Sequence, residues 1–400
     1  MSGDGVDAVV VDLGCSVVRA SPWNTDVAPM EVGCAMATPK GDVSRVAAWE
    51  SGVISDWGAL ESLLHLVFYG RAGSSFPGCG WRMGEEGGVV VLEPNPLATS
   101  RGQREKVTQL LMEQFNVTGV VFAEGPACAL FAVGRTTGLV VDVGHSSTLV
   151  AAVVDGVVVP GVSARIAGLG GWLMEAVLAA VNPELGKGKA AKEAMAQVGC
   201  AAESRAAFDA ERRGKGEQAA ASVSLSGEGG EVGVGFERFL CGELVLRPAL
   251  ALEDSSGRLD EVRASRAARV ALREERNAAQ GEKVGGVVAT LARALQDPGI
   301  GVEQRRAMAE GILVCGGAGG SIRGLAERIV SELVPLVPSD ISPALAVAPV
   351  PEYMVESVLS HAAWTGAAIL AKQAIPAGHG ITRQEYDELG PPAVHSKNYS

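Results

Sequence analysis

Two short segments, far apart in the sequence, share one pattern that constrains the fold more than any other feature. Residues 9–16 and 140–148 are each a run of β-branched residues that ends in an aspartate and a small, glycine-containing turn. A buried strand of this kind delivers a carboxylate and backbone N–H groups to one point. One such turn is common in α/β proteins. Paired turns at matching places in two halves of a chain predict a duplicated domain that clasps a polyphosphate between its lobes.

The composition indicates a folded chain with an acidic surface. At 400 residues, with 47% hydrophobic and 20% charged residues, the chain is long and apolar enough to build two or more packed lobes. The formal charge of −12 argues against a broad nucleic-acid surface, because such a surface needs clustered Lys and Arg. We therefore expect no direct nucleic-acid partner. Basic partners, or a nucleotide bound through Mg²⁺, fit this sign of charge.

The cysteines and the apolar stretches indicate a chain in a reducing compartment without a membrane segment. The seven cysteines show no CxxC spacing, and this predicts buried free thiols. Residues 1–5 have neither a basic flank nor an apolar segment of a secretory signal. The strongest apolar stretch, 139–162, is interrupted by Asp142, His145 and Asp155, so it predicts consecutive strands and no membrane span.

Strands and helices alternate along the chain, which favours an α/β fold. Residues 9–20 predict strand, turn and strand, and apolar spacing predicts helices at 60–69 and about 127–133. Ser100 is placed to cap a helix whose apolar face includes Val107, Leu111 and Phe115. A strand at 311–315 precedes a glycine loop and another helix. Residues 210–234 predict a surface hairpin or loop, and 255–280 predict either an exposed helix or a disordered excursion.

Several of these segments together resemble the actin family, and the resemblance extends over most of the chain. Residues 134–138, Gly-Arg-Thr-Thr-Gly, reproduce an actin segment and lie directly before the second aspartate strand, as they do in actin. The ending at 384–395 is close to the actin C-terminus. Further actin-like segments follow in the same order: 104–106, 237–239 with Cys241, 316–317 and 364–366. The chain is identified on this basis as a divergent actin-related protein.

The resemblance implies an α/β fold of duplicated, ribonuclease-H-like lobes, of the type shared by actin, Hsp70 and hexokinase, around a central nucleotide cleft. It also implies four subdomains. Subdomain 1 would comprise 1–32, 48–132 and 349–400, and a reduced subdomain 2 would comprise 33–47. Subdomain 3 would comprise 133–168 and 253–348, with a charged insertion at about 255–280, and subdomain 4 would comprise 169–252.

The resemblance further implies ATP or ADP and Mg²⁺ as ligands. Asp12 and Asp142 would hold waters around Mg²⁺, a cation that keeps much of its hydration shell. Residues expected to bind the nucleotide lie in four places, namely Gly14, Cys15, Ser16 and Arg19; Gly144, His145, Ser146 and Ser147; Lys192 and Glu193; and Gly316, Gly317 and Ala318. A solvated helix face is the alternative explanation for Lys192 and Glu193.

The site departs from the family at positions that matter for hydrolysis. Gly125 stands where actin carries the glutamine that orients the attacking water, and Leu149 stands where it carries a nearby histidine. Because positioning a water is most of what such a site contributes, we expect slow hydrolysis or none, and no catalytic residues. Arg19 replaces a phosphate-binding lysine, and His145 replaces an acidic residue. A nucleophile–base pair of Ser146 or Ser147 with His145, and a zinc site at the five histidines, are not expected.

Two length differences bear on assembly. Residues 32–57 are far shorter than the actin segment that grips the next subunit, with a short turn expected at 38–42, so a homopolymer is not expected. The segment between Pro248 and Gly316 is longer than its actin counterpart, and its charged part at 255–280 is either a solvated face or a partner-docking helix.

The leading functional hypothesis is a non-polymerising structural subunit of a larger cytoskeletal or motor-associated complex, such as a dynein-associated complex or a ciliary axoneme. This places the protein in the cytoplasm or cytoskeleton, including the cilium, with protein subunits as partners and no membrane. One alternative is an active ATPase or kinase of the same superfamily. Others are a subunit of a nuclear chromatin-remodelling complex, and a fold that binds nothing in its cleft.

Overall fold

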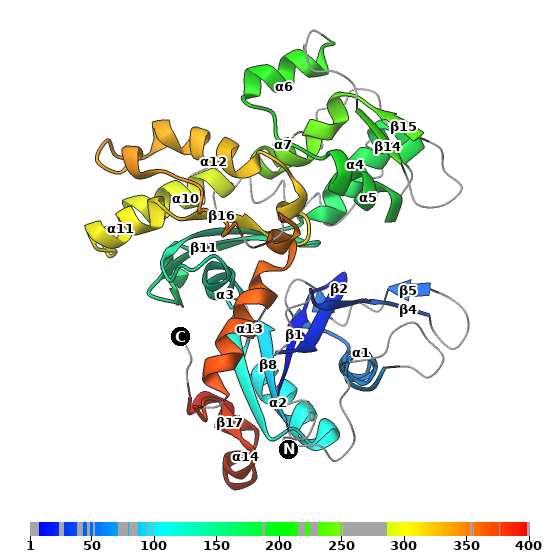
Figure 1. The fold of residues 1–400 in the computed structure, drawn as a ribbon, viewed down its shortest axis with the longest axis vertical. Coiled ribbons are helices and arrows are strands. Elements are labelled where there is room, and N and C mark those ends of the chain that lie inside the picture. The colour runs from blue at the N-terminus through cyan, green and yellow to red at the C-terminus, as the bar shows by residue number, and fades with distance from the viewer. Residues whose placement is uncertain are drawn as a thin grey trace. The chain divides into compact units, whose positions relative to one another are not determined.

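The chain forms two compact lobes, which are described separately (Figure 1). Lobe 1 comprises Met1–Gly134, Gly156–Val158 and Ala362–Ser400, and lobe 2 comprises Arg135–Asp155 and Val159–His361. The structure is a computed structural model, and it describes residues 8–23, 28–37, 43–45, 49–50, 53–70, 79, 87–93, 96–97, 99–185, 189–214, 221–224, 231–248, 250, 286–352, 354, 356–375 and 377–397.

Lobe 1 is built on a six-stranded mixed sheet with the order β17-β9-β8-β1-β2-β3. In the middle of this sheet, β1 pairs antiparallel with β2 and parallel with β8, and β8 pairs parallel with β9. The strands are β1 (Ala8–Leu13), β2 (Val17–Pro22), β3 (Met30–Gly33), β8 (Gly88–Glu93), β9 (Gly119–Glu124) and β17 (Ile381–Thr382). Short strand pairs follow β3, namely β4 (Ala35–Ala37) with β5 (Val43–Arg45) and β6 (Trp49–Glu50) with β7 (Val53–Ile54).

Helices cover both faces of this sheet. Successive side chains of a strand point to opposite faces, so neighbouring residues of β1 pack against different helices. Val9 and Val11 pack in one cluster with side chains of α1 and α2, whereas Val10 packs in another with α3 and α13. The helices of the lobe are α1 (Trp57–Tyr69), α2 (Arg101–Phe115), α3 (Gly125–Ala132), α13 (Ala362–Ala374), α14 (Arg383–Leu389) and the 3₁₀ turn η9 (Pro391–His395). Lobe 1 also contains β12 (Val157–Val158).

The crossing of α3 and α13 explains the Trp-Thr-Gly motif of the sequence. The indole of Trp364 donates a hydrogen bond from Nε1 to the Val10 carbonyl oxygen over 3.1 Å. A Cβ atom at Gly366 would lie 1.6 Å from the Cys128 carbonyl oxygen, so only glycine lets the two helices approach this closely.

Lobe 2 repeats the arrangement of strands found in lobe 1. Its central strand β10 (Gly138–Val143) pairs antiparallel with β11 (Ser147–Val154) and parallel with β16 (Ile312–Cys315). The next strand, β13 (Ala164–Ala167), pairs antiparallel with β11, as β3 does with β2 in lobe 1. The α/β fold with duplicated lobes, predicted from the sequence, is therefore confirmed.

Helices and shorter elements complete lobe 2. The helices are α4 (Gly171–Val181), α5 (Lys189–Val198), α6 (Arg205–Arg212), α7 (Leu240–Leu246), α10 (Val287–Gln296), α11 (Val302–Ala309) and α12 (Leu325–Leu333). A hairpin is formed by β14 (Ala221–Ser224) and β15 (Glu231–Val234). The 3₁₀ turns are η1 (Pro160–Val162), η2 (Pro183–Leu185), η3 (Phe236–Phe239), η5 (Gly319–Ser321), η6 (Val334–Leu336), η7 (Ser342–Ala344) and η8 (Glu356–His361).

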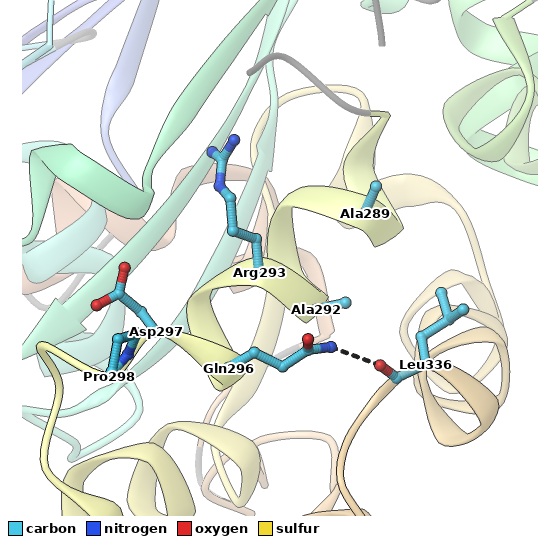
Figure 2. Close-up of a pocket in the computed structure, with 7 residues that line it drawn as sticks. All are labelled: Ala289, Ala292, Arg293, Gln296, Asp297, Pro298 and Leu336. Atoms are coloured by element: carbon cyan, nitrogen blue, oxygen red, sulfur yellow. Dashed lines mark hydrogen bonds between the residues drawn. The ribbon is translucent and has the colours of Figure 1, made fainter. Parts of the chain in front are cut away.

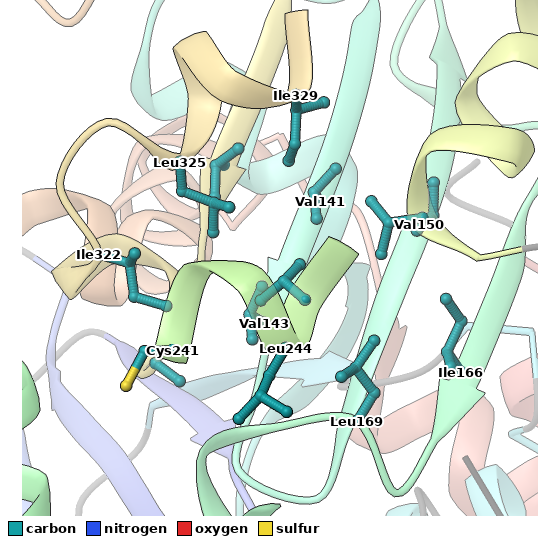
Figure 3. Packing of buried hydrophobic residues seen from close by; sticks show 14 of the residues in the cluster. Val141, Val143, Val150, Ile166, Leu169, Cys241, Leu244, Ile322, Leu325 and Ile329 are labelled. Carbon is teal, nitrogen blue, oxygen red and sulfur yellow. The ribbon is translucent and has the colours of Figure 1, made fainter. Parts of the chain in front are cut away.

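One hydrophobic core holds lobe 2 together. Figure 3 shows Val141 and Val143 of β10 beside Val150 of β11, with Leu244 of α7 and Leu325 of α12 packed near them. All five side chains are at most 1% exposed. Burying an aliphatic side chain of this size contributes about 1.5–3 kcal/mol, so the packing on this face of the sheet stabilises the lobe.

The predicted helices, strands and hairpin are present where the structure describes the chain, with some helix ends displaced by two or three residues. Ser100 caps α2 and accepts a hydrogen bond from the Gln103 backbone N–H over 3.2 Å. The helix predicted to begin near Ala127 begins earlier, at Gly125, because Pro126 is accommodated in its first turn. The hairpin expected within 210–234 is present as β14 and β15. The predictions for 38–42 and for the charged stretch 255–280 lie outside the described residues.

All seven cysteines are free thiols, and five of them are buried. Among the helices that the structure describes, none is both long enough and apolar enough to cross a bilayer.

Candidate functional site

The first predicted turn joins β1 to β2 in lobe 1 and needs glycine at its start. The Gly14 backbone N–H donates to the Asp12 carbonyl oxygen over 3.1 Å. A Cβ atom at Gly14 would lie 2.4 Å from the Val17 carbonyl oxygen, so a side chain cannot be placed there without moving the backbone. The turn thus presents backbone and the small side chains Cys15 and Ser16 at the carboxyl end of β1, where α/β sheets bind ligands.

Arg19 forms ion pairs with two carboxylates next to this turn. The strand register places Arg19 opposite Asp12, and the Arg19 Nη1 atom lies 3.6 Å from the Asp12 Oδ2 atom. The same guanidinium donates from Nε to the Glu31 Oε1 atom of β3 over 2.8 Å. Burial raises the pKa of Asp12 above its usual value, and the neighbouring Arg19 opposes that rise. Arg19 therefore already has two carboxylate partners before any phosphate binds.

The second predicted turn joins β10 to β11 in lobe 2 and is braced by backbone contacts. The Gly144 N–H donates to the Ser147 carbonyl oxygen over 3.0 Å. The first N–H groups of α4 donate back to the turn, from Gly171 to the Gly144 oxygen and from Trp172 to the His145 oxygen, each over 2.9 Å. A Cβ atom at Gly170 would lie 2.6 Å from the His145 oxygen, so the helix can approach the turn only through glycine.

The glycine loop after β16 packs directly against this second turn. Gly316 has φ of +92°, and a Cβ atom there would lie 2.1 Å from the Asp142 Oδ1 atom. The Ala318 N–H donates to the Val143 carbonyl oxygen over 3.0 Å. Asp142, Gly316 and Ala318 are thus brought together. Gly317 lies between the latter two in the chain and is partly buried.

The remaining predicted residues of lobe 2 lie in the second turn and on α5. The His145 Nδ1 atom is 3.7 Å from the Glu175 Oε1 atom of α4, and the carboxyl of Glu175 is mostly buried. Lys192 and Glu193 are partly buried on α5, a helix that packs against η5 in the glycine loop. Ser146 accepts a backbone hydrogen bond at its carbonyl from the Gly168 N–H over 2.9 Å. Sequence reasoning singled out His145 but missed its partner Glu175.

The positions linked to hydrolysis carry no side chain suited to orienting a water. Leu149 is only 4% exposed and lies opposite Asp142 in the sheet. Gly125 begins α3, and a Cβ atom there would lie 3.3 Å from the Glu93 carbonyl oxygen. The neighbouring carboxylate of Glu124 accepts a hydrogen bond from the Val158 backbone N–H over 3.1 Å, and burial raises its pKa.

A buried ion pair in lobe 1 was missed by the sequence reasoning. Glu93, at the end of β8, is 2% exposed and receives two hydrogen bonds from the guanidinium of Arg104, one of them from Nη2 over 2.6 Å. The sequence does carry a signal for Glu93. Residues 88–93 are an apolar strand that ends in an acidic residue, which is the pattern that identified Asp12. Glu93 lies opposite Glu124 in the parallel ladder.

A surface groove elsewhere on lobe 2 does not involve the predicted residues. It has a cavity volume of about 420 Å³ and is lined by α10 and the segment around η6. Figure 2 shows the hydrogen bond that closes one side, from Gln296 Nε2 to the Leu336 carbonyl oxygen over 2.6 Å. Its charged lining residues are Arg293 and Asp297 alone, and this is too little for a catalytic or metal site.

The donor atoms in the described part of the chain suit a hydrated cation better than a tightly bound one. No three His, Cys, Asp or Glu side chains gather there as metal ligands would. Each turn contributes a single aspartate, and Mg²⁺ commonly uses one or two carboxylates together with phosphate oxygens and waters. Each turn, taken by itself, therefore offers a donor that suits a hydrated Mg²⁺.

Comparisons with known proteins give one consistent result. A family model described as Actin matches residues 7–184 and 188–399. The chain is 31% identical over 412 residues to Actin-related protein 7 of Arabidopsis thaliana, covering 98% of this chain and 99% of that protein. It is 30% identical over 411 residues to Actin-related protein 7 of Oryza sativa subsp. japonica, with the same coverage. Actin-like protein 7B of Homo sapiens is 27% identical over 420 residues, covering 98% of this chain and 88% of that protein.

Proposed function

The chain belongs to the actin family, and from this premise we propose that it is a structural subunit of a larger protein complex that binds ATP or ADP with slow hydrolysis or none. The nucleotide serves as a ligand that stabilises the fold. A cytoskeletal or motor-associated complex in the cytoplasm is the assembly proposed here. A nuclear chromatin-remodelling complex is the alternative that the localisation experiment below distinguishes.

The residues of both turns are proposed to hold the nucleotide phosphates. Gly14 and Gly144 keep side chains away from the backbone of each turn, and such glycine turns bind anions through their N–H groups. Cys15, Ser16 and Arg19 would contribute in lobe 1. His145, Ser146 and Ser147 would contribute in lobe 2. Asp12 and Asp142 would hold the water shell of Mg²⁺, which when bound neutralises phosphate charge.

Two further groups of residues are proposed to contact the nucleoside. The loop of Gly316, Gly317 and Ala318 packs against the second turn through backbone contacts, as described above, which supports its place beside the phosphates. Lys192 and Glu193 on α5, which packs against η5 of this loop, would contact the ribose and base. These assignments follow the family resemblance, position by position.

The observation that supports slow hydrolysis is the loss of water-orienting side chains. Gly125 has no side chain, Leu149 is apolar and buried, and the carboxylate of Glu124 is engaged with the Val158 N–H. Phosphoryl transfer depends on positioning and charge stabilisation, so a site that cannot orient the water loses most of its rate. The remaining groups can bind a nucleotide without turning it over.

Nucleotide content and phosphate release test this proposal together. Protein purified without added nucleotide is denatured, and the released nucleotide is identified by mass spectrometry. We expect about one ATP or ADP per chain, and phosphate release from added ATP far below ordinary turnover numbers of 1–10³ per second. Leu149→His restores an imidazole and is expected to raise phosphate release, whereas Leu149→Met is the matched control. Empty protein, or rapid turnover by the wild type, would contradict the proposal.

The subunit role needs a separate experiment. A head-to-tail filament requires complementary surfaces on every subunit, and the sequence between β3 and α1 is short compared with actin. We therefore expect no sedimentable polymer when the protein is incubated with ATP and Mg²⁺. Affinity purification from native cells should recover stoichiometric partner subunits, whose identity separates the cytoskeletal from the nuclear assembly. A protein recovered alone, or one that forms filaments, would refute the subunit role.

A further inference from the structure

Two of the seven free cysteines lie together at the first turn of lobe 1. Cys15 is in the turn between β1 and β2, and Cys34 directly follows β3. The Cys34 backbone N–H donates to the Ser16 carbonyl oxygen over 2.9 Å, and this fixes the end of β3 against the turn. Both cysteines pack in the same hydrophobic cluster of the lobe.

The side chain of Cys34 contacts Gly14, the residue directly before Cys15 in the chain. Its Sγ atom donates a hydrogen bond to the Gly14 carbonyl oxygen over 3.1 Å. That oxygen and the Cys15 Cα atom share one planar peptide unit, in which they are about 3 Å apart. The Cys34 Sγ atom therefore lies within about 6 Å of the Cys15 Cα atom. Strand pairing also places Cys34 beside Ser16, the residue after Cys15. Because a disulfide brings the two sulfur atoms to about 2 Å, the Cys15 side chain must rotate towards Cys34 and the turn must move with it.

The two thiols differ in their access to solvent. Cys34 is 4% exposed, and burial, with the neighbouring Cys15 as a second cause, raises the pKa of its thiol to about 12. It is therefore protonated and shielded from the oxidant, and it loses its proton only when it reacts with the oxidised Cys15. Cys15 is partly exposed in the turn and is the thiol that a small oxidant can reach.

We propose that Cys15 and Cys34 are a redox modification site that forms a reversible intramolecular disulfide in the presence of a peroxide. The Cys15 sulfur attacks one peroxide oxygen, the O–O bond breaks, and a sulfenic acid and one water form. The Cys34 sulfur then attacks the Cys15 sulfur and displaces the hydroxyl group, which leaves as a second water with the Cys34 proton. Two thiols are oxidised and one hydrogen peroxide is reduced, and a thiol reductant reverses the bond.

The disulfide changes the first turn in a way that matters for ligand binding. It replaces the hydrogen bond from Cys34 to the Gly14 carbonyl oxygen and fixes Cys15 to the end of β3. If this turn holds phosphate, a consequence that rests on the proposed function, oxidation weakens nucleotide binding. We expect an increase of about tenfold in the Kd for ATP, the size expected when one or two phosphate hydrogen bonds are lost.

A second cysteine pair in lobe 2 provides an internal comparison. Cys200 lies near Cys241, since after burial it is a secondary cause of the raised pKa of Cys241. Cys200 is partly exposed and Cys241 is fully buried, as in the first pair. Cys200→Ser therefore removes an equally placed thiol without touching the first turn.

Thiol counting and disulfide mapping on the full chain test the proposal. The reduced protein is treated with hydrogen peroxide, denatured, and titrated for thiols, and its non-reduced digest is analysed by mass spectrometry. We expect the seven thiols of the wild type to fall by two, with a Cys15–Cys34 linked peptide that disappears on reduction. Cys200→Ser should form the same linkage. Cys34→Ser, whose hydroxyl can still donate to Gly14, should form none.

The outcomes separate the two parts of the inference. A linkage between other cysteines, or a Cys34 thiol that stays free while Cys15 is oxidised, overturns the disulfide. A linkage that forms while the Kd for ATP stays constant overturns its effect on nucleotide binding. Untreated protein that binds no ATP contradicts the proposed function, and the linkage is still decided by mass.

Discussion

The two turns sit on the same arrangement of strands but are braced by different forces. In lobe 1, Arg19 lies next to the turn and forms ion pairs with Asp12 and Glu31. In lobe 2, the residue opposite the aspartate is Leu149, and the turn is held by glycine-mediated backbone contacts with α4 and the Gly316 loop. A duplicated fold thus preserves the path of the backbone while the interactions that fix it diverge.

The difference suggests which turn can adapt to a ligand. The ion pairs of Arg19 can rearrange around added charge, because a phosphate or a metal offers new partners to its guanidinium and to Asp12. Close backbone packing does not adjust gradually, since each contact leaves no room for a side chain. We therefore expect the second turn to be the more rigid of the two and the first turn to be the more adjustable.

The largest expected effect comes from filling the packed contact of lobe 2. Gly316→Ala places a Cβ atom 2.1 Å from the Asp142 carboxylate on a residue with φ of +92°. We expect a loss of about 3 kcal/mol or more in the free energy of unfolding, from steric overlap and backbone strain together. Urea unfolding measures it. Gly161→Ala, where a Cβ atom meets nothing within 4 Å, is the control and should change stability by less than about 0.5 kcal/mol.

If Gly316→Ala behaves like its control, the second turn is not held by close packing, and the comparison between the turns fails. A loss confined to lobe 2 would support it most directly. Limited proteolysis can locate the loss, because the two lobes give distinct fragments.

An intermediate effect is expected from removing the charge that braces lobe 1. Arg19→Ala leaves the carboxylates of Asp12 and Glu31 without the guanidinium between them. We expect a loss of about 1–3 kcal/mol in unfolding free energy, the range for mostly buried charged groups that lose a partner. The control is Arg306→Ala, which breaks an exposed pair with Glu310 and should cost less than about 1 kcal/mol. Equal effects from the two arginines would show that the ion pairs of Arg19 contribute no more than a surface pair.

The smallest expected effect is a loss of stability at low pH, where charged contacts in lobe 1 are weakened. At the start of α14, a hydrogen bond from Lys397 and another from the Thr382 backbone lower the pKa of Glu385 from 4.5 to about 2. This carboxylate therefore stabilises the fold fully above about pH 4.5, and the contribution is lost as pH falls towards 2. Glu385→Gln should be less stable than wild type at pH 7, with the difference shrinking across that window. Glu388→Gln, on the same helix, is the control, and an unchanged difference between pH 7 and pH 3 would contradict this assignment.

Local sequence signals account for the elements that were predicted correctly. Each of these signals spans only a few residues. They are a strand that ends in Asp-x-Gly, a serine before an amphipathic helix and a glycine loop after an apolar strand. The duplicated topology followed from two such signals in matching positions. This is why Asp12, Asp142, Gly316 and Ser100 could be placed from the sequence.

The missed contacts depend on register and packing that no short segment encodes. Arg19 reaches Glu31 only because β2 and β3 pair with those residues opposite each other. The partner of His145 is Glu175, on a helix that begins well after the turn. Gly170 was missed for a related reason, because its need for glycine arises from the approach of α4 to the turn and not from its own φ.

An equilibrium titration of the purified chain with ATP, in the presence of Mg²⁺, tests most directly whether both turns serve one nucleotide. We expect one ATP per chain, with Asp12→Asn and Asp142→Asn each raising the Kd by about tenfold or more, since each removes one of the charges proposed for the hydrated cation. Glu388→Gln should bind as the wild type does. Affinity that is indifferent to either aspartate, or the absence of any binding, would contradict a nucleotide site built from both turns.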